Sequence, residues 1–180
     1  IYAGERRDTV FSINVDPARA PETNVPLVTF KIKYLDALNE CLQQAEVTCT
    51  INRVEDNEVD ANLTNKNIST QVVRVVIAKA LSESNNLADK RKFKEAKEIL
   101  SQALKFATEN KNKVHDANAL NSLISDINVT MKAMENNAVW SGSAGYHAKS
   151  KAMQHRIQRC TEEHEDTYSS YRTRRKGGMA

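Results

Sequence analysis

The feature that most constrains the fold is a change of hydrophobic period about one third of the way along the 180-residue chain. Up to about residue 53, apolar and polar side chains alternate with a period of two, which is typical of strands with one buried face. From about residue 64 onward, apolar side chains recur every three or four residues, which is typical of amphipathic helices. This order predicts an α+β chain in which a β portion precedes a bundle of helices.

Three segments carry the alternating pattern, over residues 9–15, 27–34 and 46–53. The side chains predicted to point inward from the second and third segments are Val28, Phe30, Ile32, Tyr34, Val47, Cys49 and Ile51. Three strands leave two open edges and one apolar face to cover. We therefore expect an antiparallel β-sandwich portion over residues 1–58, completed by sequence outside this chain, by a partner or by the helices that follow.

Four helical patterns follow, over residues 64–84, 87–107, 116–134 and 147–163. They predict a bundle of about four helices over residues 59–165, ahead of a basic tail over 166–180. Leu100 and Leu123 lie in the middle of two apolar stripes, so both side chains are predicted to be deeply buried.

The chain opens at Ile1 rather than at a methionine, so we expect it to be a piece of a longer protein. No apolar run approaches the ~20 residues that a membrane-spanning helix needs. Its three cysteines, Cys41, Cys49 and Cys160, are too few and too scattered for a disulfide framework or a zinc site. These observations favour a cytoplasmic location with free thiols.

The net charge of +3 is concentrated in the tail, at Arg172, Arg174, Arg175 and Lys176. Such a basic run can bind nucleic acid or an acidic membrane surface, which we keep as an alternative function. No aromatic platform or recognition helix adjoins it, so we interpret it as a solvated tail and do not expect a nucleic-acid partner.

Residues with catalytic potential are few and lack the spacing of known sites. The chain has no glycine-rich phosphate loop, no nucleophile elbow and no His-Glu-x-x-His pair. Cys160 with nearby His155, or His164 inside an acidic cluster, would be the only basis for a small enzyme. We interpret Cys160 as a small apolar residue on the packed side beside Ile157 and the acidic cluster as a solvated face, and predict no catalytic, metal-binding or cofactor-binding residue.

Trp140 is the only tryptophan, and it stands where the third helical pattern stops, ahead of a run of small residues. It has two possible roles: to plug the end of the bundle, or to anchor a partner from an exposed position. We predict the plug, packed against the helix that holds Ile157 or against Tyr168 and Tyr171.

Short motifs at both ends of the chain resemble a known family. Residues 2–8, Tyr-Ala-Gly-Glu-Arg-Arg-Asp, resemble the segment that follows the von Willebrand factor A domain in a group of eukaryotic multidomain proteins, where a G-x-x-R-D element leads into a β-sandwich. A second resemblance, to the helical half of that family, is carried by Asn65, Gln71 and Arg74 and by the stretches 88–100 and 150–171. Family members join this region to a von Willebrand A domain and to either a Hedgehog/intein-type domain or a RING or U-box module.

The resemblance implies a non-catalytic interaction or scaffold module of a larger protein that is ubiquitin-ligase-like or self-processing. Its implied partners are the neighbouring von Willebrand A domain or a larger assembly. Arg7, Asp8 and Arg74 are the structural motif residues. We expect Arg7 and Asp8 to pin the first strand to its neighbour by a charge-assisted hydrogen bond.

Overall fold

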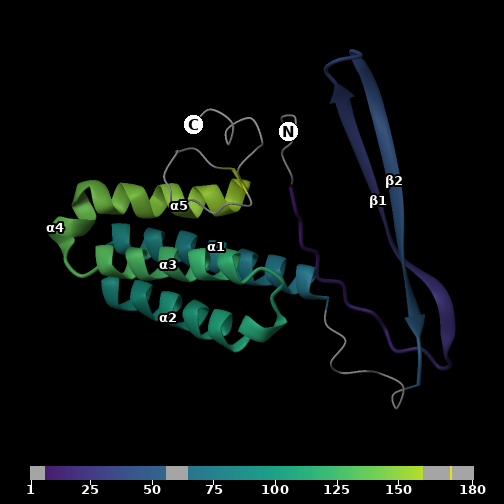
Figure 1. The fold of residues 1–180 in the computed structure, drawn as a ribbon, viewed down its shortest axis with the longest axis horizontal. Coiled ribbons are helices and arrows are strands. Elements are labelled where there is room, and N and C mark those ends of the chain that lie inside the picture. Colours follow the sequence, from purple (N-terminus) through teal and green to yellow (C-terminus); the bar gives the residue numbers. More distant parts are fainter. Residues whose placement is uncertain (1–6, 56–64, 160–170, 172–180) are drawn as a thin grey trace. The chain divides into compact units, whose positions relative to one another are not determined.

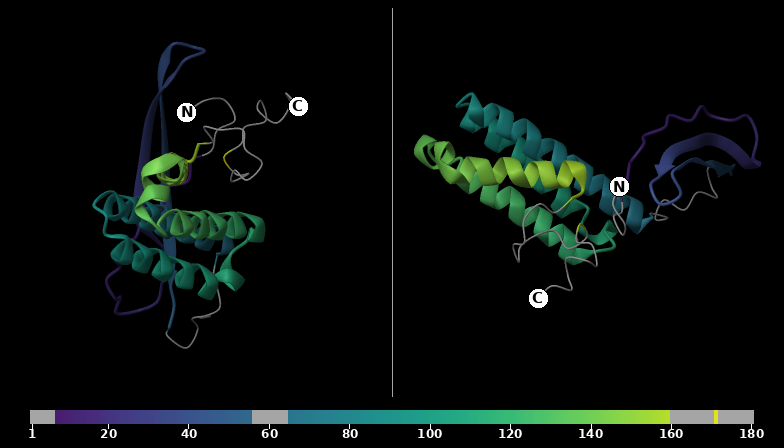
Figure 2. Two further views of the ribbon diagram at one scale, coloured as in Figure 1. Left: turned by 90° about the vertical axis from the view of Figure 1, so that its left-hand side faces the viewer. Right: turned by 90° about the horizontal axis from the view of Figure 1, so that it is seen from above.

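The computed structural model describes residues 7–55, 65–159 and 171. The chain divides into two compact units, which we call the hairpin unit (residues 12–63) and the helical unit (residues 1–11 together with 64–180). Figure 1 shows both units, and Figure 2 gives two further views. The antiparallel sheet followed by helices makes this a mixed α+β chain.

The hairpin unit contains a two-stranded antiparallel sheet of β1 (Glu22–Asp36) and β2 (Cys41–Arg53). The turn between them is organised by the Asp36 carboxylate, which accepts hydrogen bonds from the Leu38 main-chain N–H at 3.0 Å and from Asn39 Nδ2 at 2.7 Å. These bonds hold the pKa of the Asp36 carboxyl below its usual range, with the Asn39 side chain as the largest cause. Glu40 completes the turn with a φ of 51°.

The register of the two strands separates their side chains into two chemically different faces. On one face Thr29 lies opposite Thr48, with 2.9 Å between their hydroxyl oxygens, and Lys31 pairs with Glu46 at 3.1 Å; Leu35 lies opposite Leu42 near the turn. The other we call the hairpin apolar face; it consists of Val28, Phe30, Ile32, Tyr34, Ala45, Val47 and Cys49, with Gln43 opposite Tyr34. This division is the one that the alternating pattern predicts.

The structure contradicts the first of the three expected strands. Residues 9–15 form no strand, and Phe11, Ile13 and Val15 are 59%, 41% and 41% exposed. Alternation specifies which side chains share a face but supplies no neighbouring strand to pair with. The main chain of Asp8 forms its hydrogen bonds with side chains of the helical unit instead.

Four long helices form the helical unit, and side-chain caps mark where two of them begin. The Asn65 side chain accepts the Asn67 and Ile68 N–H groups at the start of the first, and the Asp116 side chain accepts the Ala119 N–H at the start of the third. In order, the elements are α1 (Lys66–Asp89), α2 (Phe93–Glu109), η2 (Lys111–Lys113), α3 (Ala117–Ala133), α4 (Asn137–Val139), η3 (Trp140–Ala144) and α5 (Gly145–Ile157).

Helix α1 is central to the helical unit, because it contacts α2, α3 and α5, while α3 also contacts α2 and α5. Leu100 on α2 and Leu123 on α3 are 0% and 1% exposed, which confirms their predicted burial. Other large apolar side chains that fill the same core are Val73, Ile77, Leu81, Leu120, Ile127 and Met134.

The last helix is shorter than the expected 147–163. It ends at Ile157, and Gln158 follows as its cap in a left-handed conformation with a φ of 50°. Within the described ranges, no helix is both long enough and apolar enough to cross a membrane.

Candidate functional site

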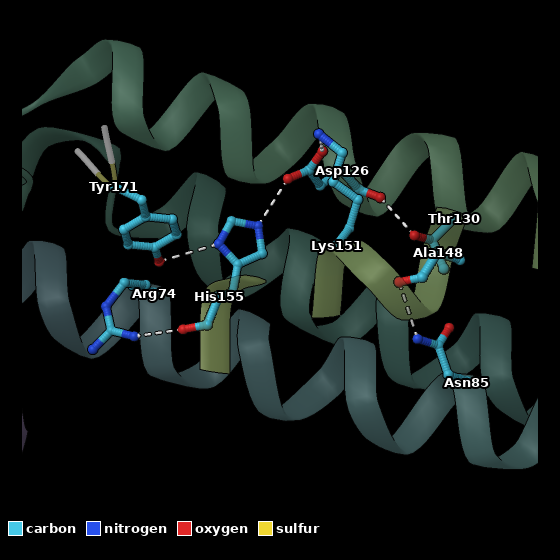
Figure 3. Close-up of polar contacts among 8 residues, drawn as sticks. All are labelled: Arg74, Asn85, Asp126, Thr130, Ala148, Lys151, His155 and Tyr171. Carbon is cyan, nitrogen blue, oxygen red and sulfur yellow. Dashed lines mark hydrogen bonds and ion pairs between the residues drawn. The ribbon is translucent and has the colours of Figure 1, made fainter. Parts of the chain in front are cut away.

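A deeply buried polar contact in the helical unit joins α3 to α5. His155 on α5 is 1% exposed and Asp126 on α3 is 5% exposed. His155 Nε2 lies 2.8 Å from Asp126 Oδ2 (Figure 3). Because an ionised carboxylate can only accept hydrogen bonds, the ring donates through Nε2 to Asp126.

Lys151 and Tyr171 complete this contact, and we call the four residues the His155 cluster (Asp126, Lys151, His155 and Tyr171). Lys151 Nζ lies 3.3 Å from the other carboxylate oxygen of Asp126. The Tyr171 hydroxyl lies 3.3 Å from His155 Nδ1, and the two rings meet edge to face with centroids 5.8 Å apart. The cluster thus joins α3, α5 and residue 171, which lies in the expected tail but is 9% exposed.

Both ring nitrogens of His155 face a partner, and only 1% of the residue is exposed. Cys160 and His164, the other residues of the small-enzyme hypothesis, lie outside the described residues. In the part of the chain that the structure describes, no group of three His, Cys, Asp or Glu residues is placed to hold a metal ion.

Arg74 lies beside the cluster, is 3% exposed, and donates hydrogen bonds in three directions. Its Nη1 donates to the His155 main-chain oxygen at 3.0 Å, as Figure 3 shows, and its Nε donates to Gln71 Oε1 at 2.6 Å. Its Nη2 donates to the Asp8 main-chain oxygen at 3.0 Å. The structure therefore brings together two of the three motif residues, Asp8 and Arg74.

The sequence predicts that Arg7 and Asp8 pin the first strand to its neighbour, but residues 9–15 form no strand. Residues 7–11 belong to the helical unit instead. Gln158 at the end of α5 accepts the Asp8 N–H through Oε1 at 2.7 Å and donates to the Asp8 oxygen through Nε2 at 2.7 Å. Arg7 is half-buried next to this contact.

Trp140 is buried, with 6% of its surface exposed, at the end of the unit where η3 leads into α5. Its indole N–H donates to Asp89 Oδ1 at 3.1 Å, and its ring meets Phe93 edge to face at 6.4 Å. Lys149 Nζ lies 5.9 Å from the ring centroid, and a Cβ at Gly145 would clash with the Trp140 main-chain oxygen. Trp140 therefore packs against the first turns of α5 rather than against Tyr171.

The other interaction candidates, Arg172, Arg174, Arg175 and Lys176, lie outside the described residues, as does Tyr168. The hairpin apolar face presents exposed apolar side chains in the part of the chain that the structure describes. Ile32, Tyr34 and Val47 on it are 60%, 51% and 61% exposed.

The sequence reasoning missed the partners of His155. Asp126 interrupts an apolar stripe, three residues after Leu123 and one before Ile127. An acidic residue in such a position must be paired if the stripe is buried, and that signal could have identified it. Nothing in the sequence pattern assigned Lys151 or Tyr171 to the His155 cluster, or Gln158 to Asp8.

Comparison with protein-family models, curated proteins and solved structures finds no significant match to this chain.

Proposed function

We propose that this chain is a non-catalytic protein-interaction and scaffold module, and that the hairpin apolar face is its docking surface. The observation that carries this proposal is the exposure of Ile32 and Val47, at 60% and 61%, on a sheet face that is mostly apolar and carries Gln43 opposite Tyr34. Exposed apolar area of this kind is typical of surfaces that another protein covers.

A two-stranded sheet cannot cover its own face, and isolated hairpins are at best marginally stable in water. Full burial of an isoleucine or valine side chain is worth about 1.5–3 kcal/mol. With somewhat over half of each side chain exposed, covering Ile32 and Val47 would add about 1–2 kcal/mol apiece. A partner that covers the face therefore stabilises both the complex and the hairpin.

The occupant that we propose is β-structure from a neighbouring domain of the same longer protein, which would complete an antiparallel sandwich over the hairpin apolar face. The alternation of β1 and β2 suits a sandwich, because such sheets present one apolar inner face to a second sheet. The resemblance of residues 2–8 suggests a von Willebrand A domain as that neighbour. It also suggests that the longer protein is ubiquitin-ligase-like or self-processing, with this chain as its scaffold arm.

A cytoplasmic setting is part of the same proposal. Cys41 and Cys49 are both free in the structure, and Cys49 lies on the hairpin apolar face. A thiol that remains reduced on a docking surface suits a reducing compartment.

The test is binding of the upstream domain of the longer protein to this chain, measured by size-exclusion chromatography and by pull-down. Ile32→Glu places a charge on the hairpin apolar face and should abolish binding. Gln44→Glu introduces the same charge on the opposite face, beside Lys33, and should leave binding unchanged. Equal binding by both variants, or no binding by the unaltered chain, would overturn the proposal.

A further inference from the structure

The two strands of the hairpin differ in how their outer edges are protected. β1 contains Pro26, which has no N–H to offer a further strand, and Asn24, which has a φ of 55°. Both register irregularities place an extra residue on β1, one before Val25 and one after Pro26. Prolines and bulges on an edge strand hinder the pairing of another strand with it. The first half of β1 is therefore poorly suited to accept a further strand.

The outer edge of β2 has none of these features. Its 13 residues, Cys41–Arg53, include no proline, glycine or lysine, and no extra residue interrupts them. Glu46 is the only charged side chain before the final Arg53. Among the described residues β2 pairs with β1 alone, so its other edge faces no strand there. A long, regular and nearly uncharged edge of this kind favours the addition of another strand.

The sequence of β2 is compatible with an antiparallel copy of itself. Pairing about Val47 brings this residue opposite Val47 of the second copy, and it brings Ala45 opposite Cys49. All three residues belong to the hairpin apolar face, so the apolar faces of the two hairpins continue into each other.

The charge of Glu46 distinguishes this register from its neighbours. Pairing about Glu46 itself would place two carboxylates directly opposite each other, which is destabilising. Pairing about Val47 places Glu46 opposite Thr48 of the second copy, and it is the one register that uses the whole strand Cys41–Arg53. Lys31 of the same hairpin already pairs with Glu46 at 3.1 Å. The strand thus fits a second copy without a like-charge contact.

We infer that the outer edge of β2 is a self-association surface, and that its occupant is β2 of a second copy of this chain, paired antiparallel about Val47. The two hairpins then form one four-stranded sheet with a β1 strand at either edge. Because β1 is poorly suited to pairing, the assembly ends at a dimer. The inference does not depend on what covers the hairpin apolar face. Self-pairing is lost on dilution, whereas coverage by a domain of the same longer protein is not.

The first test is the mass of the 180-residue chain in solution, measured by sedimentation equilibrium over a range of concentrations without any other domain. We expect the mass to rise from 20.2 kDa toward twice that value and no further. A chain that keeps the monomer mass at every concentration would overturn the second copy as occupant. Growth beyond the dimer would overturn the assignment of β1 as a closed edge.

Disulfide formation tests the register, in a chain whose three native cysteines are replaced by serine. Val47→Cys places its thiol opposite the same thiol of the second copy, at a main-chain separation that a disulfide can bridge. Val28→Cys is the matched control, because Val28 lies on the same face but on β1. After air oxidation we expect a covalent dimer from Val47→Cys and a monomer from Val28→Cys on a non-reducing gel. Equal cross-linking of the two variants would overturn the register.

Two opposite charges at Thr48 test the same pairing without a disulfide. Thr48→Lys places a cation opposite Glu46 of the second copy and should tighten the dimer, whereas Thr48→Glu places a carboxylate there and should weaken it. Both variants lose the contact with the Thr29 hydroxyl, so damage to the hairpin alone would affect both in the same direction. Each dimer contains two such pairs, so the dissociation constants should differ by about tenfold or more. Equal dissociation constants for the two variants would overturn the pairing.

Discussion

Asp126 is buried against two partners, and replacing it with asparagine removes its charge without removing its volume. Its side chain is 7% exposed, and it pairs with His155 at 2.8 Å and Lys151 at 3.3 Å. Breaking a buried ion pair typically costs about 3–5 kcal/mol. The Lys151 side chain retains 22% exposure and can partly turn to water. We therefore expect Asp126→Asn to lower the free energy of unfolding by about 2–4 kcal/mol.

The matched comparison is Glu95→Gln, the same chemical change at an exposed pair in the same unit. Lys92 Nζ lies 3.0 Å from Glu95 Oε1, and the two side chains are 52% and 57% exposed. Exposed pairs contribute only about 0.2–1 kcal/mol. Thr130 donates to the main-chain oxygen of Asp126, so that bond is retained in Asp126→Asn.

The assay is urea unfolding followed by far-ultraviolet circular dichroism, with free energies from linear extrapolation at an unchanged slope. The reasoning predicts a clearly lower midpoint for Asp126→Asn and a nearly unchanged one for Glu95→Gln. If the two variants lose the same free energy within ~0.5 kcal/mol, the cluster does not hold α3 to α5 as described.

Three further outcomes follow from other parts of the structure. Leu100→Ala or Leu123→Ala removes a fully buried side chain and should cost about 2–5 kcal/mol in the same urea assay, whereas an unchanged midpoint would show that the core is misplaced. Trp140→Phe should lower stability by about 1–2 kcal/mol through its lost indole hydrogen bond and smaller ring, and the unaltered chain should show the blue-shifted fluorescence of an enclosed indole; emission typical of water would contradict its burial. Asp36 has a lowered pKa in the folded turn, so its contribution to the hairpin is present above the unfolded pKa and is lost as the pH falls through the folded one. Asn39→Ala should raise that pKa in a titration followed by nuclear magnetic resonance, and an unchanged value would exclude Asn39 as the main cause.

The sequence predicts the two faces of the hairpin because strand period alone determines which side chains lie together. Ile32 and Val47 were assigned to the same side of their strands, and the register places them on one face. The same pattern failed for residues 9–15, since alternation carries no information about hydrogen-bonding partners. The main chain of Asp8, which directly precedes this segment, is bound by the side chains of Arg74 and Gln158, which lie far along the sequence.

The helices and their core are likewise readable from periodicity, as Leu100 and Leu123 show. The His155 cluster is not, because its members come from α3, α5 and residue 171 and meet only when the helices have packed. Polar residues in an apolar stripe, such as Asp126, indicate that a buried partner exists but do not say which residue it is.

The central claim is that the hairpin apolar face is a docking surface for β-structure of a neighbouring domain. It is tested most directly by amide hydrogen exchange across β2, measured for this chain alone and within the longer protein. Strand pairing and coverage of the face should slow exchange across Cys41–Arg53 in the longer protein, while the amides of α3 exchange equally in both. Equal exchange of the β2 amides in the two proteins would contradict the account.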